Sequence, residues 1–314
     1  LEESSRPAVQ AFQEEYVVHV PDIDEAPGAE PLVAGYRSLL ALPIIGREGP
    51  VGAFQFGRRE AGGFANEEID LASMLVDQMA YQLENLRLVR QLSTSRDAVI
   101  HGMARLAESR GGDLGGHIDR ICAYCQLLAR RVQNQPEFVG TVTDDFIATL
   151  TRAAALHDIG KVGISDSILL KPGKLTEDEF AVMRTHARLG AEILEDLMVT
   201  HGSFPRLEMG VEVALHHHER WDGTGYPHGI AGDEIPLAAR IVAIVDVYDA
   251  LTSKRVYKEA WAFDRIIDYI SKERGGYFEP RLVDLFLENL DVFKVIRRNL
   301  PDGENLASSL PDTF

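Results

Sequence analysis

His157, Asp158 and Lys161 fall within one short stretch that reads as the end of a helix. Adjacent side chains on a helix diverge by about 100°, so His157 and Asp158 can serve different metal ions, or one terminal and one bridging position. This favours a metal cluster over a general-base pair. By itself the dipeptide is more often a surface histidine beside a capping aspartate, so its meaning depends on the other histidines and carboxylates of the chain.

Further histidines and carboxylates occur in segments that are otherwise rich in leucine, valine, isoleucine and alanine. They are Glu108, His117, His186, and the runs 215–227 and 244–251. Burying so many of these side chains without partners would cost several kcal/mol. A shared role as metal ligands therefore explains them better than a place in a hydrophobic core.

Mixed imidazole and carboxylate ligands without a thiolate suit iron, manganese or zinc more than calcium. Two or three adjacent metal ions with a bridging carboxylate suit the hydrolysis of a phosphodiester. Such a site lowers the pKa of a bound water from about 15.7 toward about 7 and holds the attacking and leaving oxygens at once. The sequence therefore indicates metal-dependent phosphodiester chemistry.

The composition is that of an ordinary globular protein with an acidic balance. The chain has 314 residues, 45% hydrophobic and 26% charged, which is long enough for two domains. The net charge of −17 argues against DNA or RNA as the main partner but leaves room for a small phosphodiester.

No apolar run approaches the roughly 20 residues that span a bilayer and no signal peptide is visible, so we expect no membrane segment and a cytoplasmic location. Because the first residue is Leu1, we expect a fragment or a mature form.

The two cysteines, Cys122 and Cys125, form a C-x-x-C pair. Such a pair can act in redox chemistry or bind zinc, but there is no second pair and the surrounding pattern is helical. We therefore expect two small core residues on one helix face, which is compatible with a reducing compartment.

The N-terminal region reads as strands and turns. Strand-like runs cover residues 16–20, 38–44 and 51–57, and the turn residues 46–50 predict a β-hairpin between the last two runs. Together with residues 64–69, these runs resemble the C-terminal part of a GAF sensory domain. The resemblance implies a partial α+β domain whose partner is an unidentified small ligand or protein.

A helix is predicted to link this region to the rest of the chain. Asn66 is a suitable N-cap before Glu67 and Glu68. An apolar seam follows at spacings of four, three, four and three residues: Ala72, Val76, Met79, Leu83 and Leu86. One interpretation is an amphipathic helix packed on its own domain, and the other is a parallel coiled coil in a homodimer. We expect the coiled coil, because the segment lies between two predicted domains.

From about residue 97 onward the sequence predicts helices only. Thr176 and Glu179 form a capping-box pattern at the start of one of them. The predicted helices cover residues 98–108, 144–156, 177–186, 188–199, 208–217, 236–253, 263–274 and 280–296, and a further one begins at His117. The chain is therefore expected to be multidomain, with an α+β part followed by an all-α domain.

Four motifs of the helical region, taken together, resemble the HD-GYP family of bacterial cyclic dinucleotide phosphodiesterases. They are HDIGK at residues 157–161, HHE at 217–219, DGTGYP at 222–227 and DVYDALTSKRVYK at 246–258. The match runs over about residues 108–280 and implies the all-helical fold of HD-type metal-dependent phosphohydrolases.

The resemblance implies a set of metal ligands with Asp158 as the bridging residue, holding two or three divalent ions, iron first and manganese second. The implied ligands are Glu108, His117, His157, Asp158, His186, His217, His218 and Asp246. His216 is not expected to be a ligand. Asp249 lies on the same helix face as Asp246 and would hold a hydrogen bond behind the ligands.

The resemblance also implies residues that contact the substrate. Lys161 would lie near the scissile phosphate, where it stabilises charge or protonates the leaving oxygen. Arg255 and Lys258 would contact the phosphates or guanine. The loop formed by Gly225, Tyr226 and Pro227 would frame the pocket.

The sequence departs from the family pattern between Glu108 and His117. The spacing of nine residues is kept, but residues 110–115 lack the usual aspartate and threonine, and glycines loosen the segment. A dinuclear site therefore stays open beside a trinuclear one. Glu279 also stands where the family usually has aspartate.

The expected organisation is a GAF-like domain over residues 1–66, a linker over 67–100, an HD-GYP catalytic domain over 101–298 and a flexible tail over 299–314. The expected function is hydrolysis of cyclic di-GMP by a metal-activated water, giving linear pGpG with GMP as a further product, under control of the sensory domain. Two other functions stay open. One is hydrolysis of a hybrid cyclic dinucleotide or another nucleotide phosphodiester, and the other is a receptor that binds the dinucleotide without cleaving it.

Overall fold

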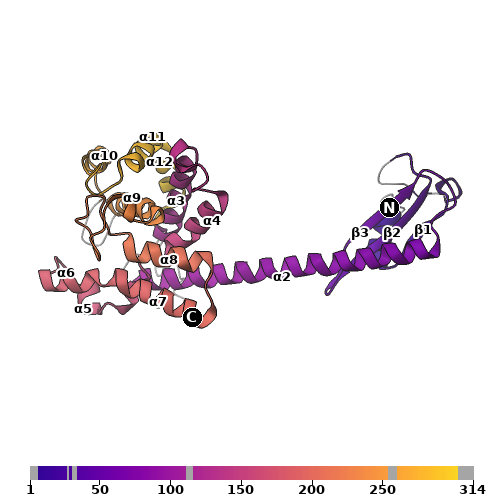
Figure 1. The fold of residues 1–314 in the computed structure, drawn as a ribbon, viewed down its shortest axis with the longest axis horizontal. Coiled ribbons are helices and arrows are strands. Elements are labelled where there is room, and N and C mark those ends of the chain that lie inside the picture. The colour runs from indigo at the N-terminus through magenta and orange to yellow at the C-terminus, as the bar shows by residue number, and fades with distance from the viewer. Residues whose placement is uncertain (1–5, 27, 30–33, 111–115, 254–259, 303–314) are drawn as a thin grey trace, which may run out of the picture. The chain divides into compact units, whose positions relative to one another are not determined.

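The computed structural model describes residues 6–26, 28–29, 34–110, 116–253 and 260–302. The chain divides into two compact units, Leu1–Arg96 and Asp97–Phe314. Each unit is described by itself, and Figure 1 shows the elements of both.

The first unit contains a three-stranded antiparallel sheet in the order β1-β2-β3. The strands are β1 (Val18–Val20), β2 (Ser38–Gly46) and β3 (Gly49–Arg58). The tight connection from Gly46 to Gly49 confirms the predicted hairpin. Sequence reasoning missed α1 (Pro7–Glu14) and the short turn η2 (Ile23–Glu25).

Strand β2 is buried on both faces, because successive side chains of a strand point to opposite sides. Leu39 and Ala41 pack with α1 in one cluster. Leu40, Leu42 and Ile44 pack with the first turns of α2 in another. The sheet is therefore covered by helix on both faces.

Helix α2 (Asn66–Arg110) carries the predicted apolar seam, but Asn66 is its first helical residue and not its N-cap. The Ala65 carbonyl accepts the first helical hydrogen bond, from the Ile69 amide, so the predicted cap was wrong by one residue. Ala72 and Val76 are only 9% and 1% exposed because they pack on the sheet of their own unit, whereas Leu86 is 66% exposed. The five seam residues thus do not share one environment. The first interpretation, packing on the same domain, holds for Ala72 and Val76, and a homodimeric coiled coil stays a prediction for the exposed part.

The second unit is helical, as predicted, and its described residues form no strand apart from an isolated bridge between Arg274 and Phe278. After the end of α2 come the helices α3 (His117–Gln133), α4 (Asp144–Ala153), α5 (Asp166–Leu169), α6 (Glu177–Arg184), α7 (His186–His201), α8 (Pro205–His216), α9 (Leu237–Thr252), α10 (Phe263–Lys272), α11 (Pro280–Glu288) and α12 (Leu290–Asn299). Short 3-10 turns lie between them: η3 (Pro136–Phe138), η4 (Ala154–Leu156), η5 (Ile159–Gly163) and η6 (Gly232–Glu234).

Three helices that were predicted to be continuous are interrupted in the structure. The helix predicted over 144–156 ends at Ala153 and tightens into η4, so His157 and Asp158 lie between two 3-10 turns rather than on one helix. The helix predicted through His186 ends at Arg184, and His186 opens α7. The helix predicted over 280–296 breaks at Asn289, whose side-chain amide donates to the Leu285 carbonyl.

The core of this unit surrounds α3 and α9. Helix α3 packs against α4, α9, α11 and α12, which gather in one part of the unit in Figure 1. Rings of Tyr124, Tyr248, Phe286 and Phe293 contact one another at its centre. Cys125 is fully buried in this core as a free thiol, whereas Cys122 is partly buried against a second cluster. The expectation of two core residues on one helix face is therefore confirmed for Cys125 alone. None of the described helices is long and apolar enough to cross a membrane.

Candidate metal centre

The eight implied metal ligands all belong to the second unit and come from six places in its fold. Glu108 lies near the end of α2, His117 opens α3, and Asp246 lies in α9. The remaining ligands stand at element boundaries: His157 and Asp158 between η4 and η5, His186 at the start of α7, and His217 and His218 after α8.

The structure brings seven of these residues into two groups of potential metal-ligand atoms. The first, here called the His186 group, is Asp158, His186, His217 and His218, and the second, the His117 group, is His117, His157 and Asp246. Within each group the ligand atoms lie within 4.8 Å of one another. Glu108 stands beside the His117 group, with its Oε1 3.5 Å from His117 Nε2.

Asp158 faces both groups. Its Oδ2 lies 3.3 Å from Nε2 of His157, and its Oδ1 lies 3.3 Å from Nε2 of His186 and 3.9 Å from Nε2 of His217. One carboxylate oxygen is thus directed at each group, which is the arrangement that a bridging ligand requires. The bridging role implied by the resemblance fits this geometry.

Three imidazoles are oriented by backbone carbonyls of their own helical turns. The Nδ1 atoms of His157, His186 and His217 lie 2.9, 2.7 and 3.0 Å from the carbonyl oxygens of residues 154, 183 and 213. Their Nε2 atoms are buried and make no hydrogen bond with any described residue. A histidine that donates from Nδ1 and keeps a free Nε2 lone pair is the usual form of a metal ligand. Three buried lone pairs without partners would be costly otherwise, so these residues fit divalent cations.

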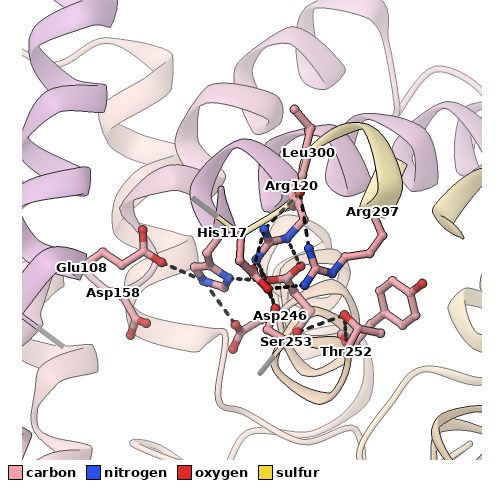
Figure 2. A network of polar contacts seen from close by, with 12 residues as sticks. Glu108, His117, Arg120, Asp158, Asp246, Thr252, Ser253, Arg297 and Leu300 are labelled. Carbon is pink, nitrogen blue, oxygen red and sulfur yellow. Dashed lines mark hydrogen bonds and ion pairs between the residues drawn. The ribbon is translucent and has the colours of Figure 1, made fainter. Parts of the chain in front are cut away.

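His117 is oriented differently, by a buried carboxylate and an arginine (Figure 2). Asp249 Oδ2 lies 2.7 Å from His117 Nδ1 and accepts its proton, which confirms the predicted hydrogen bond behind the ligands. Arg120 is fully buried and donates to both oxygens of Asp249, at 2.6 and 2.8 Å. Arg120 also donates to Ser253 Oγ and to the carbonyl of Leu300. This network joins α3, α9 and the end of α12 behind one ligand.

Sequence reasoning missed Arg120. The available signal was a charged residue on the helix face that also carries His117, Tyr124 and Leu128, at spacings typical of one buried stripe. A charge in such a position needs a buried partner, and Asp249 is that partner.

The carboxylates set the proton affinities of the site. Burial opposes ionisation of Asp158, but the Lys161 ammonium and His157 hold its pKa well below the usual range. Burial disfavours charged His157, but Asp158 and Asp246 raise its pKa to about 9. Burial and the charge of His157 lower the pKa of His217 to about 3. A divalent cation competes with the proton for Nε2 of His157, since both use the same lone pair.

Two glycines allow the ligands Asp158 and His186 to approach each other. A Cβ atom on Gly160 would collide with the carbonyl oxygen of His186 and with the amide nitrogen of Gly190, and would lie 2.9 Å from the Gly190 Cα. The turn η5 can therefore touch the backbone of α7 only with glycine at this position. This contact sets the separation of the HDIGK motif from His186.

Among the described residues implied to contact substrate, Lys161 and Tyr226 lie beside the His186 group. Lys161 Nζ pairs with Asp158 Oδ2 and its side chain is 27% exposed. The Tyr226 ring stacks on His218, with centroids 4.8 Å apart, and the Arg184 guanidinium also lies over the Tyr226 ring, 5.1 Å from its centroid. A Cβ on Gly225 would collide with the backbone at Glu219 and Arg220, so only glycine fits there. Arg255 and Lys258 lie outside the described residues.

Family models match both parts of the chain. A model described as HD domain matches residues 103–282, and one described as GAF domain matches residues 2–84. The chain is 42% identical to a cyclic di-GMP phosphodiesterase of Vibrio cholerae serotype O1, over 76% of this chain and 48% of that protein. It is 37% identical to 3'3'-cGAMP-specific phosphodiesterase 2 of the same organism, over 76% and 44%. It is 41% identical to the cyclic di-GMP phosphodiesterase response regulator RpfG of Xanthomonas campestris pv. campestris, over 68% and 53%. The chain thus spans about half the length of these relatives.

Proposed function

Since the chain belongs to the HD domain family, within its HD-GYP group and with a GAF domain before the HD domain, we propose that it hydrolyses the phosphodiester bonds of cyclic di-GMP. The observation that carries this proposal is the pair of histidine and carboxylate groups that share Asp158, with the ammonium of Lys161 beside the shared carboxylate.

The HD domain binds divalent metal ions, and we propose that this chain holds iron, or manganese in its place. The His186 group and the His117 group would each hold one ion, with Asp158 between them. Glu108 would add a ligand on the side of His117, where a third ion would need it. Bound ions of this kind lower the pKa of a bound water and offset phosphate charge.

The protein side chains have their own roles in this proposal. Lys161 is half-buried and paired with Asp158, so its ammonium is held at the edge of the ligand groups. There it would donate to a phosphate oxygen and stabilise the charge that develops as the bond breaks. Tyr226, packed on His218, would present its ring to a base of the substrate. The products would be linear pGpG and, after a second cleavage, GMP.

A hybrid cyclic dinucleotide is the second candidate substrate. A relative of similar identity and coverage is named as 3'3'-cGAMP-specific. The two substrates share both phosphodiester bonds and differ in one base, so the same ligand groups and Lys161 would serve either of them.

The sensory and oligomeric parts of the function are also proposals. The GAF domain would bind a small ligand or a protein and regulate the phosphodiesterase. Helix α2 exposes large apolar side chains, among them Leu86, Val89 and Leu92. Such side chains support a homodimer formed by this helix. A cytoplasmic location stays a prediction.

The test measures metal content and hydrolysis together. The protein is purified without oxygen, its iron and manganese are counted, and turnover of cyclic di-GMP and 3'3'-cGAMP is followed for the wild type and for Asp158→Ala. Asp291→Ala is the matched control, because Asp291 is 96% exposed and pairs only locally with Lys294. We expect two or three ions per chain in the wild type and the control, with turnover lost in Asp158→Ala. Bound metal without turnover of either substrate would contradict the proposal and favour a receptor.

A further inference from the structure

A third cluster of potential metal-ligand atoms lies apart from the two groups described above. It consists of His216, the last residue of α8, with Glu219 and His228. Their candidate ligand atoms lie within 4.8 Å of one another, and the rings of His216 and His228 have centroids 5.6 Å apart. None of the three belongs to the His186 or His117 group.

Glu219 has a buried negative charge that lacks a cationic partner. The residue is 2% exposed, and its two oxygens accept hydrogen bonds from the backbone amides of His228 and Gly229, at 2.8 and 3.1 Å. Across the described part of the chain, no lysine, arginine or histidine nitrogen forms an ion pair with it. Buried carboxylates are usually paired with a cation or bound to a metal. The two amides leave further lone pairs on both oxygens.

His216 supplies a second unpaired polar group at the same place. Its Nδ1 atom is buried and makes no hydrogen bond with any described residue. The His228 side chain is exposed, so it can rotate without disturbing the core. Two imidazoles and a carboxylate are one of the common ligand sets of zinc, which leaves a fourth position for water or a small anion.

We propose that His216, Glu219 and His228 form a separate binding site for one zinc ion. Ligand atoms around a tetrahedral zinc lie roughly 3.4 Å apart, from bond lengths of about 2.0–2.2 Å. The present spacing, within 4.8 Å, is wider than that value, so binding would draw the three side chains together, with the exposed His228 the freest to move. The ion offsets the charge of Glu219 and uses the free lone pair of His216.

The site would connect the motif loop to the helix that carries ligands. His228 follows the Gly225-Tyr226-Pro227 loop by one residue, and His216 directly precedes His217. Bound zinc would therefore hold the loop that carries Tyr226 against the end of α8. Its occupancy would change the mobility of the loop without replacing any ligand of the His186 group.

The test compares zinc binding by the wild type and by His228→Ala, both carrying their HD-domain ions. His228 is exposed, so its loss leaves the fold and the amide hydrogen bonds of Glu219 in place. His101→Ala is the matched control, because His101 is a partly exposed histidine of the same unit outside all three clusters. Zinc per chain is counted by elemental analysis after dialysis, and cobalt(II) is added as a spectroscopic substitute.

We expect His228→Ala to bind about one zinc fewer than the wild type and the His101→Ala control, with iron and manganese content unchanged. The tetrahedral cobalt absorption of the wild type should fall in the same variant. Equal zinc content and equal cobalt spectra in the wild type and His228→Ala would overturn the proposal. This result concerns zinc alone, so it is distinguishable from failure of the phosphodiesterase assay.

Discussion

His117 is oriented in a different way from His157, His186 and His217, the other imidazoles whose Nδ1 contacts are described above. In the His186 group, the imidazoles of His186 and His217 are fixed by carbonyls three or four residues earlier in the chain. In the His117 group, His117 is fixed by Asp249, which is 132 residues away in sequence. The first arrangement forms with its own helical turns. The second exists only when α3 and α9 have packed together, so changes far from the ligands should affect it more.

The largest expected effect is that of Asp249→Ala. Removing the carboxylate takes both Asp249 hydrogen bonds from the buried Arg120 and leaves Asp302, 40% exposed and 3.0 Å away, as its remaining carboxylate partner. Breaking a buried ion pair typically costs about 3–5 kcal/mol of stability, and we expect the lower end of that range here. His117 also loses the acceptor that orients it, so we expect metal affinity of the His117 group to fall roughly 10- to 100-fold while the His186 group keeps its ion. Urea unfolding and metal counting measure the two effects.

The double variant Asp249→Ala/Arg120→Met separates the effect on stability from the effect on metal affinity. Without the buried charge, stability should return toward the wild-type value, whereas the metal affinity of the His117 group should stay low. Full recovery of both quantities would show that Asp249 serves the packing of Arg120 and does not position His117.

Removal of one metal ion should have the next largest effect. An ion present at 100 times its dissociation constant stabilises the folded state by about 2.7 kcal/mol. We therefore expect a chelator to lower the free energy of unfolding by about that amount for each ion released. The ions should leave in two steps, because the two groups are supported differently. A chelator that leaves the unfolding curve of the wild type unchanged would contradict a resident metal.

Glu108→Gln should have a smaller effect, confined to the side of His117. The substitution removes a charge 3.5 Å from His117 Nε2 and nearly keeps the shape of the side chain. We expect about a tenfold loss of affinity for one ion, equivalent to about 1.4 kcal/mol, with the remaining ions retained. Competition with a coloured chelator measures it, and an unchanged ion count and affinity would indicate a site that does not use Glu108.

The smallest effect should appear in the pH dependence of stability. Burial opposes ionisation of Asp249, but Arg120 and His117 keep its pKa below the usual range. The folded state therefore binds fewer protons here than the unfolded chain. This contribution is complete above the ordinary aspartate pKa of about 3.9 and is lost as the pH falls through the lower folded value. The free energy of unfolding of the wild type should therefore exceed that of Asp249→Asn by less at about pH 3 than at about pH 6. Free energies of unfolding that change with pH in parallel for the two proteins would contradict this prediction.

Much of the fold could be predicted because local patterns agree with it. The hairpin followed from turn residues between two strand-like runs, and Asn66 gave the start of α2 to within one residue. The breaks at Ala153, Thr185 and Asn289 were not predicted, because the apolar pattern continues through them. Thr185 and Asn289 each bond a backbone carbonyl of the preceding turn, a local contact that the pattern of apolar residues does not reveal. The seam prediction was wrong at Ala72 and Val76 because the sheet, not a second helix, covers them.

The ligand residues were accessible to sequence reasoning because their types are unusual in apolar helices. Their partners were less accessible. Arg120 looked like an ordinary helix charge until Asp249 was found 2.6 Å away, from a helix more than a hundred residues later. Glu219 belongs to the HHE motif, but its nearness to His216 and His228 depends on the fold of the loop after α8 and not on the sequence pattern.

The metal centre also depends on the contact between Gly160 and α7, although Gly160 is neither charged nor a metal ligand. Because backbone touches backbone there, the smallest possible side-chain addition would push η5 away from His186. A methyl group at Gly160 would then widen the gap between Asp158 and His186 while every ligand remained present in the sequence. A gene carrying that single change would still score as an intact member of its family, although its protein would have lost the spacing on which shared metal coordination depends.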